Sequence, residues 1–416
     1  MRMDSDKRFL QVFSLFFCSL MTLICGAQTA TQDQQNPDRT SHSVRGDLRY
    51  ELVFPDSYDG RIKWKFAEYE QITTSQERAF VADLNRWGAL GYKLVASVYG
   101  LPTAIVVQDE GRYVYDTFET RSSVPYVKNG LREDLEKVND SSFRLVDHLL
   151  ISRQCNVSDL NDPVLIESCQ FRDLFIIEKL GLSKKNVKQM VISSSPGWGS
   201  RTSVDLTAGV NAKLKEGFYP VKLISKFEVA LERGELSEEL NQDKLEFEVI
   251  SSDSTADLEK KVNEIARQGF RLAFAENGIA LLYRNETTSG VPASYKWVRA
   301  DKNGLDKELN KLEQLSARYC TVYPDDNGIK NSLIFEVGPQ SSHKPSEFKI
   351  LHFSFDFKEK PSQERVYVDL DPPSKEQLRR MNDLAKGGFV VRGLFQSDRI
   401  RISDGAQFYV LLERAR

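Results

Sequence analysis

One pattern of apolar and polar positions recurs along the chain and ends each time in a glycine followed by an aromatic residue. Apolar residues are spaced by three and four ahead of the glycine, as in Leu258, Val262 and Ile265. This spacing predicts a helix with one buried face. The glycine predicts a left-handed helix end, where a Cβ is disfavoured. The four clear copies are LNRWGALGYKLVAS (84–97), VNAKLKEGFYPVKL (210–223), VNEIARQGFRLAFA (262–275) and MNDLAKGGFVVRGL (381–394).

Segments typical of strands surround each of these helices. One precedes the helix, at 63–72, 244–252 and 348–357, and the chain leaves the glycine as another. A closing segment follows at 227–234, 279–285 and 408–416. The sequences TSQE (74–77) and SKEQ (374–377) are capping boxes that mark two helix starts. The predicted unit is therefore strand, helix, strand, strand, with the last two strands as a hairpin.

Two degenerate copies raise the number of predicted units to six. The segment 135–148 keeps Phe143 but has Glu136 for the asparagine and Ser142 for the glycine, and 311–324 keeps only Tyr319. The asparagine-equivalent positions are 85, 136, 211, 263, 312 and 382. We predict an α+β fold of six tandem βαββ units at 47–111, 112–182, 187–235, 243–286, 293–338 and 347–416, with insertions at 154–170 and 358–371.

A unit of about 50 residues has a thin core and open sheet edges. We therefore expect the units to associate as neighbours in one compact or curved array. The unit resembles a small uncharacterised bacterial domain with a Tyr-Glu strand, a helix ending Leu-Asn-x-x-Gly-x-x-Gly-Trp, a Leu-Val strand and a closing Leu-x-Arg. Unit 1 matches it with Tyr69-Glu70, Leu84-Asn85, Gly88, Gly91-Tyr92 and Leu94-Val95, and lacks the tryptophan. The resemblance implies this fold and its tandem arrangement, and no activity.

The N-terminus has the three-part layout of a secretory signal peptide. Basic residues precede an apolar run at 9–24, and Cys25-Gly26-Ala27 fits a cleavage site. The alternative is an uncleaved membrane anchor, for which the run is short. We predict a signal peptide at 1–27, a flexible polar spacer at 28–46, and an extracytoplasmic location, either periplasmic or secreted. No later run is long and apolar enough to span a membrane.

Removal of the predicted signal peptide leaves three cysteines in the exported chain. In an oxidising compartment Cys155 and Cys169 are candidates for a disulfide at the mouth of the unit 2 insertion. Cys320 follows Tyr319 in a predicted strand and is expected to be a buried free thiol.

Composition sets limits on the partners. The chain of 416 residues has a formal net charge of −3 and 28% charged residues, which argues against nonspecific nucleic-acid binding. Asp369 and Asp371 precede a helix start, and two carboxylates are too few oxygen ligands for a hard cation. Asp301 to Gly304 opens like a calcium loop but lacks the closing ligands. Trp198 lies in a glycine-rich segment predicted to be a flexible turn, and a small role in binding a partner is kept as the alternative.

No motif assigns a reaction. The repeated asparagines, Asn85, Asn211, Asn263 and Asn382, are interpreted as bonding to a strand backbone or to a loop beside the helix end, rather than to a ligand. The four histidines form no recognisable catalytic pairing. We assign no catalytic, metal or cofactor residue and expect no cofactor. The sequence favours a non-enzymatic binding or scaffolding protein whose partner is an unknown protein or envelope component. The alternative is an extracytoplasmic enzyme, such as a hydrolase, with its site between units.

Overall fold

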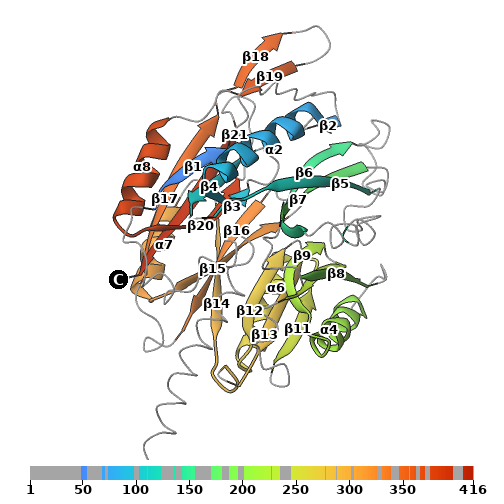
Figure 1. The fold of residues 1–416 in the computed structure, drawn as a ribbon. Helices are drawn as coiled ribbons and strands as arrows, with labels where there is room; N and C mark the ends of the chain where they lie inside the picture. Colours follow the sequence, from blue (N-terminus) through green and yellow to red (C-terminus); the bar gives the residue numbers. More distant parts are fainter. Residues whose placement is uncertain are drawn as a thin grey trace, which may run out of the picture.

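The computed structural model describes the segments that build the sheets and helices (Figure 1). The described residues are 48–53, 68–70, 74–97, 103–109, 111–122, 135, 143–154, 170–179, 187–194, 201–225, 227–234, 245–276, 278–286, 288–300, 304–325, 330–338, 346–355, 357–361, 366–370, 375–396 and 406–415. The predicted signal peptide and spacer lie outside them.

Five segments share the order strand, helix, strand, strand. Unit 1 has β1 (Tyr50–Val53), α2 (Thr74–Ala89), β3 (Tyr92–Ser97) and β4 (Ala104–Gln108). Unit 3 has β8 (Lys188–Ser193), α4 (Arg201–Leu214), β9 (Tyr219–Ser225) and β10 (Glu228–Arg233). Unit 4 has β11 (Glu246–Ser251), α6 (Thr255–Ala266), β12 (Arg271–Glu276) and β13 (Ile279–Arg284). Unit 5 has β14 (Ser294–Arg299), α7 (Leu305–Gln314), β15 (Arg318–Asp325) and β16 (Lys330–Val337). Unit 6 has β17 (Ser346–Phe355), α8 (Lys375–Lys386), β20 (Val390–Gln396) and β21 (Ala406–Ala415).

Unit 2 has strands β5 (Tyr115–Ser122), β6 (Phe143–Gln154) and β7 (Gln170–Lys179), and Leu135 between β5 and β6 is helical. Two further elements lie in connections. Strand β2 (Glu68–Glu70) comes from unit 1, and β18 (Phe357–Pro361) with β19 (Val366–Leu370) forms a two-stranded hairpin in the unit 6 insertion. The described chain is thus a mixed α+β protein built from antiparallel sheets.

All six main sheets have the same strand order. The closing strand lies in the centre, with the first strand on one side and the strand after the helix, here called the middle strand, on the other. Unit 1, for example, has the order β1-β4-β3, and the predicted hairpin of the last two strands is present. The middle strand carries a β-bulge in every unit, as between Leu272 and Phe274 of unit 4. A bulge leaves ladder groups unpaired and increases the local twist.

The recurrent glycines end helices in the left-handed conformation, as predicted. The backbone φ angles of Gly91, Gly217, Gly269 and Gly388 lie between +86° and +93°. The aromatic residue after three of them is covered by an arginine of the closing strand. Arg284 lies 4.5 Å from the centre of the Phe270 ring, and Arg414 lies equally close to Phe389. The closing Leu-x-Arg pattern therefore completes the helix end.

The hydrophobic cores lie mainly between units. Six clusters of buried side chains each join residues of two neighbouring units, in the order 1–2, 2–3, 3–4, 4–5, 5–6 and 6–1. Leu258 and Val262 of α6, for instance, share a cluster with Tyr295 of β14. Burying such a Leu or Val stabilises the fold by ~1.5–3 kcal/mol. An isolated unit would expose this face to water.

The units close into a ring. Each described helix also packs on the first strand of the following unit, and α8 packs on β1, so the last unit contacts the first. Figure 1 shows α8 and β1, from opposite ends of the chain, side by side. Middle strands of successive units also contact one another. Between β6 and β9 this contact includes an ion pair of Asp147 with Lys222.

Two details of the predicted units were wrong. The pre-helix strand of the unit 1 sheet is β1, whereas β2, inside the expected 63–72 strand, pairs with β6 of unit 2. In unit 5 the left-handed position is Ser316, at a φ of 51°, so Ala317 rather than Tyr319 occupies the aromatic position. The backbone bond from Ala317 N–H to the Leu312 carbonyl matches the bond from Phe389 to Leu384 in unit 6.

Candidate functional site

The repeated asparagine binds the backbone of the next unit. In each case its Oδ1 accepts from the N–H, and its Nδ2 donates to the carbonyl, of one aromatic residue in the following first strand. The N···O distances are 2.6–3.0 Å for the pairs Asn85–Tyr115, Asn211–Phe247, Asn263–Tyr295 and Asn382–Tyr50. We call this two-bond contact the clasp. The predicted bond to a strand backbone is confirmed, and the strand belongs to the neighbouring unit.

A tyrosine hydroxyl completes three of the clasps. The hydroxyl oxygens of Tyr115, Tyr295 and Tyr50 accept from the backbone N–H groups of Leu94, Leu272 and Val391, at 2.8, 2.8 and 3.1 Å. Each N–H lies beside the bulge of the preceding unit's middle strand. Because burial removes water from the phenol, the pKa of Tyr50 rises to about 12, and that of Tyr115 also lies above its usual value.

Unit 5 makes the equivalent contact with a different residue. Asn310 lies six residues before Ser316, the spacing of the clasp asparagine, yet it is exposed. Glu313, three residues further along α7, accepts instead from the N–H of Phe348 at 2.8 Å. The asparagine-equivalent position predicted here, Leu312, is a buried core residue. The shift by one helical turn explains why the sequence pattern is weak in this unit.

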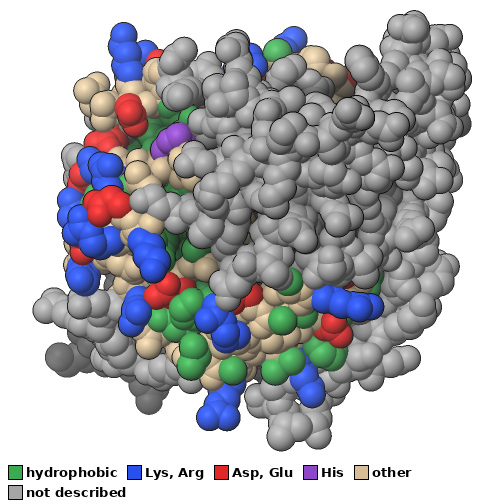
Figure 2. Space-filling model, turned by 90° about the horizontal axis from the view of Figure 1, so that it is seen from above, with side chains coloured by type: hydrophobic (Ala, Val, Ile, Leu, Met, Phe, Trp, Pro, Cys, Tyr) green, Lys and Arg blue, Asp and Glu red, His purple; other side chains and the backbone are tan. Residues whose placement is uncertain are grey.

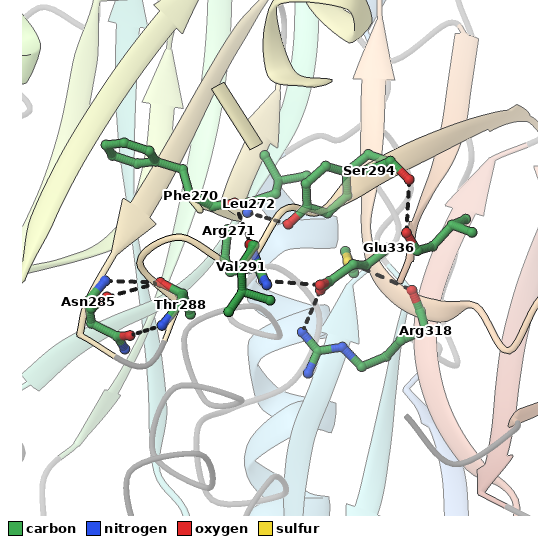
Figure 3. A network of polar contacts seen from close by, with 12 residues as sticks. Phe270, Arg271, Leu272, Asn285, Thr288, Val291, Ser294, Arg318 and Glu336 are labelled. Atoms are coloured by element: carbon green, nitrogen blue, oxygen red, sulfur yellow. Dashed lines mark hydrogen bonds and ion pairs between the residues drawn. The ribbon is translucent and has the colours of Figure 1, made fainter. Parts of the chain in front are cut away.

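A buried carboxylate joins units 4 and 5 on their inner side. Figure 3 shows Glu336 of β16 between two guanidinium groups, Arg271 from unit 4 and Arg318 from unit 5. The N···O distances are 3.1 and 3.2 Å, and the Glu336 side chain is 4% exposed. Arg271 also donates to the carbonyl of Val291 at 3.0 Å. The carboxylate is thus compensated on both sides, as a buried charge requires.

A polar cluster unlike the repeated clasps joins units 1, 2 and 3, and we take it as the candidate functional site. Asp147 on β6 forms an ion pair with Lys222 on β9 at 2.5 Å, and both side chains are nearly buried. The second carboxylate oxygen of Asp147 accepts from the backbone N–H of Ser97 at 3.1 Å and from the Ser97 hydroxyl. Three middle strands therefore each contribute one polar group to the same point.

The cluster has the residue types of a hydrolytic site, but its groups bind one another. A serine hydroxyl that donates to a carboxylate resembles a nucleophile beside its base. Here Lys222 binds one oxygen of Asp147, while two donors of Ser97 bind the other. Such mutual bonding stabilises a buried charge and holds three strands in fixed positions.

Most residues singled out from the sequence do not meet at this site. Cys155, Cys169, Trp198, Asp301 and Asp371 lie outside the described residues. Gly304 directly precedes α7 as its N-terminal capping residue, as expected for a turn and helix start. Cys320 is buried and reduced, with its Sγ 3.8 Å from the Arg318 carbonyl oxygen. His352 of β17 lies against the ring of Tyr409, with ring centres 5.0 Å apart.

Sequence reasoning missed Ser97, Asp147 and Lys222 as a group. The available signal was a charged residue beside apolar ones in each of two strands, Asp147 after Leu145 and Val146 in β6 and Lys222 between Val221 and Leu223 in β9. Among the described residues, no three His, Cys, Asp or Glu side chains lie close enough to share a metal ion.

On the face shown in Figure 2, the acidic and basic side chains of the described residues are interspersed rather than separated. On α8, Arg379 pairs with Glu376 at 2.8 Å and with Asp383 at 3.3 Å. In the part of the chain that the structure describes, no helix combines the length and apolar character needed to cross a membrane.

Comparisons with protein-family models, with curated proteins and with solved structures found no match to this chain.

Proposed function

We propose that the chain is an exported, non-enzymatic scaffolding or binding protein, built from six tandem copies of one βαββ unit closed into a ring. The repeated clasps, the shared strand order and the left-handed helix ends support a common unit. The sequence resemblance of the unit to a small bacterial domain agrees with this origin and carries no activity. The N-terminal signal layout supports a periplasmic or secreted location.

The observation that carries the proposal is how the polar groups of the junctions are used. The asparagine amides, the tyrosine hydroxyls, Asp147 and Glu336 are engaged in holding one unit to the next. An active site needs polar groups directed at a substrate, and these are directed at one another. A closed ring instead presents fixed surfaces to a partner, which lowers the conformational entropy lost on binding.

The partner in this proposal is a protein or another envelope component. Two exposed apolar side chains on separate units are suitable contact points, Leu90 at 62% exposure and Val204 at 65%. The mixed surface charge in Figure 2 does not favour a nucleic acid, which selects clustered basic residues.

The second candidate is a hydrolase with its site at the junction of units 1, 2 and 3. The one observation in its favour is the asymmetry of the Ser97, Asp147 and Lys222 cluster, which combines a hydroxyl, a carboxylate and an amine. Turnover of ester, amide or glycoside substrates by the wild type, lost in Ser97→Ala, would establish it.

Two experiments test the first proposal. N-terminal sequencing of exported material is expected to begin at Gln28, and intact protein retained in the cytoplasm would exclude export. A photo-crosslinking residue at position 90 or 204 is expected to capture a defined envelope component in living cells. The matched control places the same residue at the exposed, charged position 260 of α6. Equal adducts at all three positions, or turnover that depends on Ser97, would contradict a binding role.

A further inference from the structure

Six similar units must join in one order, and the clasp alone does not specify that order. In four units the groups that an asparagine binds on the next first strand are backbone atoms. Backbone atoms are the same in every strand, so the asparagine does not distinguish one first strand from another. Correct assembly therefore requires side chains that differ between junctions.

The middle strands carry side chains that differ from one junction to the next. Counting five residues from each recurrent glycine or its equivalent (91, 142, 217, 269, 316 and 388) gives Ala96, Asp147, Lys222, Phe274, Thr321 and Gly393. Only the neighbouring units 2 and 3 have charges at this position, and the charges are opposite and paired. A second ion pair between units joins Arg271 of unit 4 to Glu336 of unit 5.

We propose that these two buried inter-unit ion pairs specify which units become neighbours, and so suppress mispaired rings and chain-exchanged oligomers. If unit 2 docked onto a unit with Phe274 or Gly393 at the facing position, Asp147 would be buried without its cation. An uncompensated buried carboxylate strongly disfavours the wrong pairing. The correct pairing gains little stability by comparison, which is the usual balance when a buried polar pair provides specificity.

The close contact at Gly393 adds a steric difference to the electrostatic one. A Cβ at this position would lie 2.6 Å from the Tyr319 hydroxyl oxygen of unit 5. The 5–6 junction therefore fits glycine, and a side chain such as Asp or Lys at the same position would require Tyr319 to shift. The inference concerns assembly of the chain and holds whether or not the ring binds a partner.

The test compares refolding of the full chain in wild type, in Asp147→Leu/Lys222→Met and in Lys296→Gln/Glu308→Gln. The last variant is the matched control, because its ion pair joins β14 to α7 of one unit and is partly exposed. The fraction refolded to monomer is measured by size-exclusion chromatography with light scattering, and the Tm is measured on that monomer.

The apolar double variant also removes the acceptor of the Ser97 N–H, so its Tm is expected to fall modestly, while its monomer yield falls to less than half, with oligomers making up the difference. The control is expected to refold like wild type. A wild-type monomer yield in the apolar variant overturns the proposal. If that variant gives no folded monomer, the proposal is tested instead by the monomer yields of the charge reversals Asp147→Lys and Lys222→Asp, made singly and together. A combined reversal that yields more monomer than either single reversal supports the proposal, and one that yields no more overturns it.

Discussion

The side-chain amide of Asn382 binds both backbone groups of Tyr50, a residue 332 positions earlier in the chain. The Tyr50 hydroxyl in turn accepts a hydrogen bond from the backbone N–H of Val391 in unit 6. The 6–1 junction is the one junction not bridged by the continuous chain. It nevertheless has a complete clasp and a large apolar cluster, which includes Phe353, Phe389 and Phe408. Closure of the ring therefore rests on non-covalent contacts alone.

The tyrosine hydroxyl at a clasp is expected to contribute measurably to stability. Tyr295→Phe removes the hydroxyl that accepts from the buried N–H of Leu272, and loss of this bond costs about 1–3 kcal/mol. Tyr113→Phe is the control, because its hydroxyl bonds to the exposed carboxylate of Asp109, and we expect a change within about 0.5 kcal/mol. Urea unfolding measures both. Equal losses in the two variants would show that the hydroxyl at the bulge has no special role.

Gly269 is expected to tolerate a side chain far less well than Gly290, although both have positive φ angles of +93° and +75°. A Cβ at Gly269 would lie 2.5 Å from the Thr288 carbonyl oxygen, whereas a Cβ at Gly290 would meet no atom within 4 Å. In each alanine variant, a residue with a Cβ must adopt the positive φ angle, which lowers stability by roughly 1–2 kcal/mol. Gly269→Ala adds a steric clash, so its melting temperature is expected to be clearly lower. Identical melting temperatures would contradict this helix-end geometry.

Ring stability is expected to fall at high pH through Tyr50. The pKa of Tyr50 is about 12 in the folded protein against 10.0 for an unperturbed tyrosine. Below pH 10.0 the Tyr50 phenol is protonated in both the folded and the unfolded chain, and its contribution to stability is fully present. As the pH rises further the unfolded chain ionises first, so up to about 2–3 kcal/mol is lost as the pH passes through the folded pKa. The stability difference between wild type and Tyr50→Phe should shrink over this range. A difference independent of pH would refute the assignment.

Cys155 and Cys169 remain a predicted disulfide. The last described pair of the β6–β7 ladder is Gln154 with Gln170, the residues adjacent to the two cysteines. If the register continues by one residue, the Cα atoms would be about 4.5–5.5 Å apart, within the range of a disulfide. Peptide mapping of exported protein without reduction should recover a 155–169 linkage. Alkylation of both thiols in that material would exclude it.

The sequence predicted those features that depend on local interactions. The helix ends at Gly91 and Gly269 were predictable because only glycine readily adopts their φ angles. The bond from Asn263 to a strand backbone was predicted, but its partner Tyr295 was not, because every first strand offers the same backbone groups. The short strand β1 was missed because four residues give too little alternation to compete with the longer 63–72 segment.

The candidate site was not predictable for a related reason. Asp147 and Lys222 lie 75 positions apart and meet only because two middle strands converge inside the ring. A charged residue in an apolar strand indicates a partner without identifying it. Ser97 carries no signal of its own, since serine is common at strand ends.

Ring closure is tested most directly by the distance between β1 and α8. Spin labels at positions 51 and 383, on the two sides of the Tyr50–Asn382 clasp, report this distance by pulsed electron paramagnetic resonance. The ring predicts a short, narrow distance distribution that does not change when labelled protein is diluted with unlabelled protein, and that broadens in Asn382→Leu. A long, broad distribution in the wild type would show an open array and contradict the closed ring.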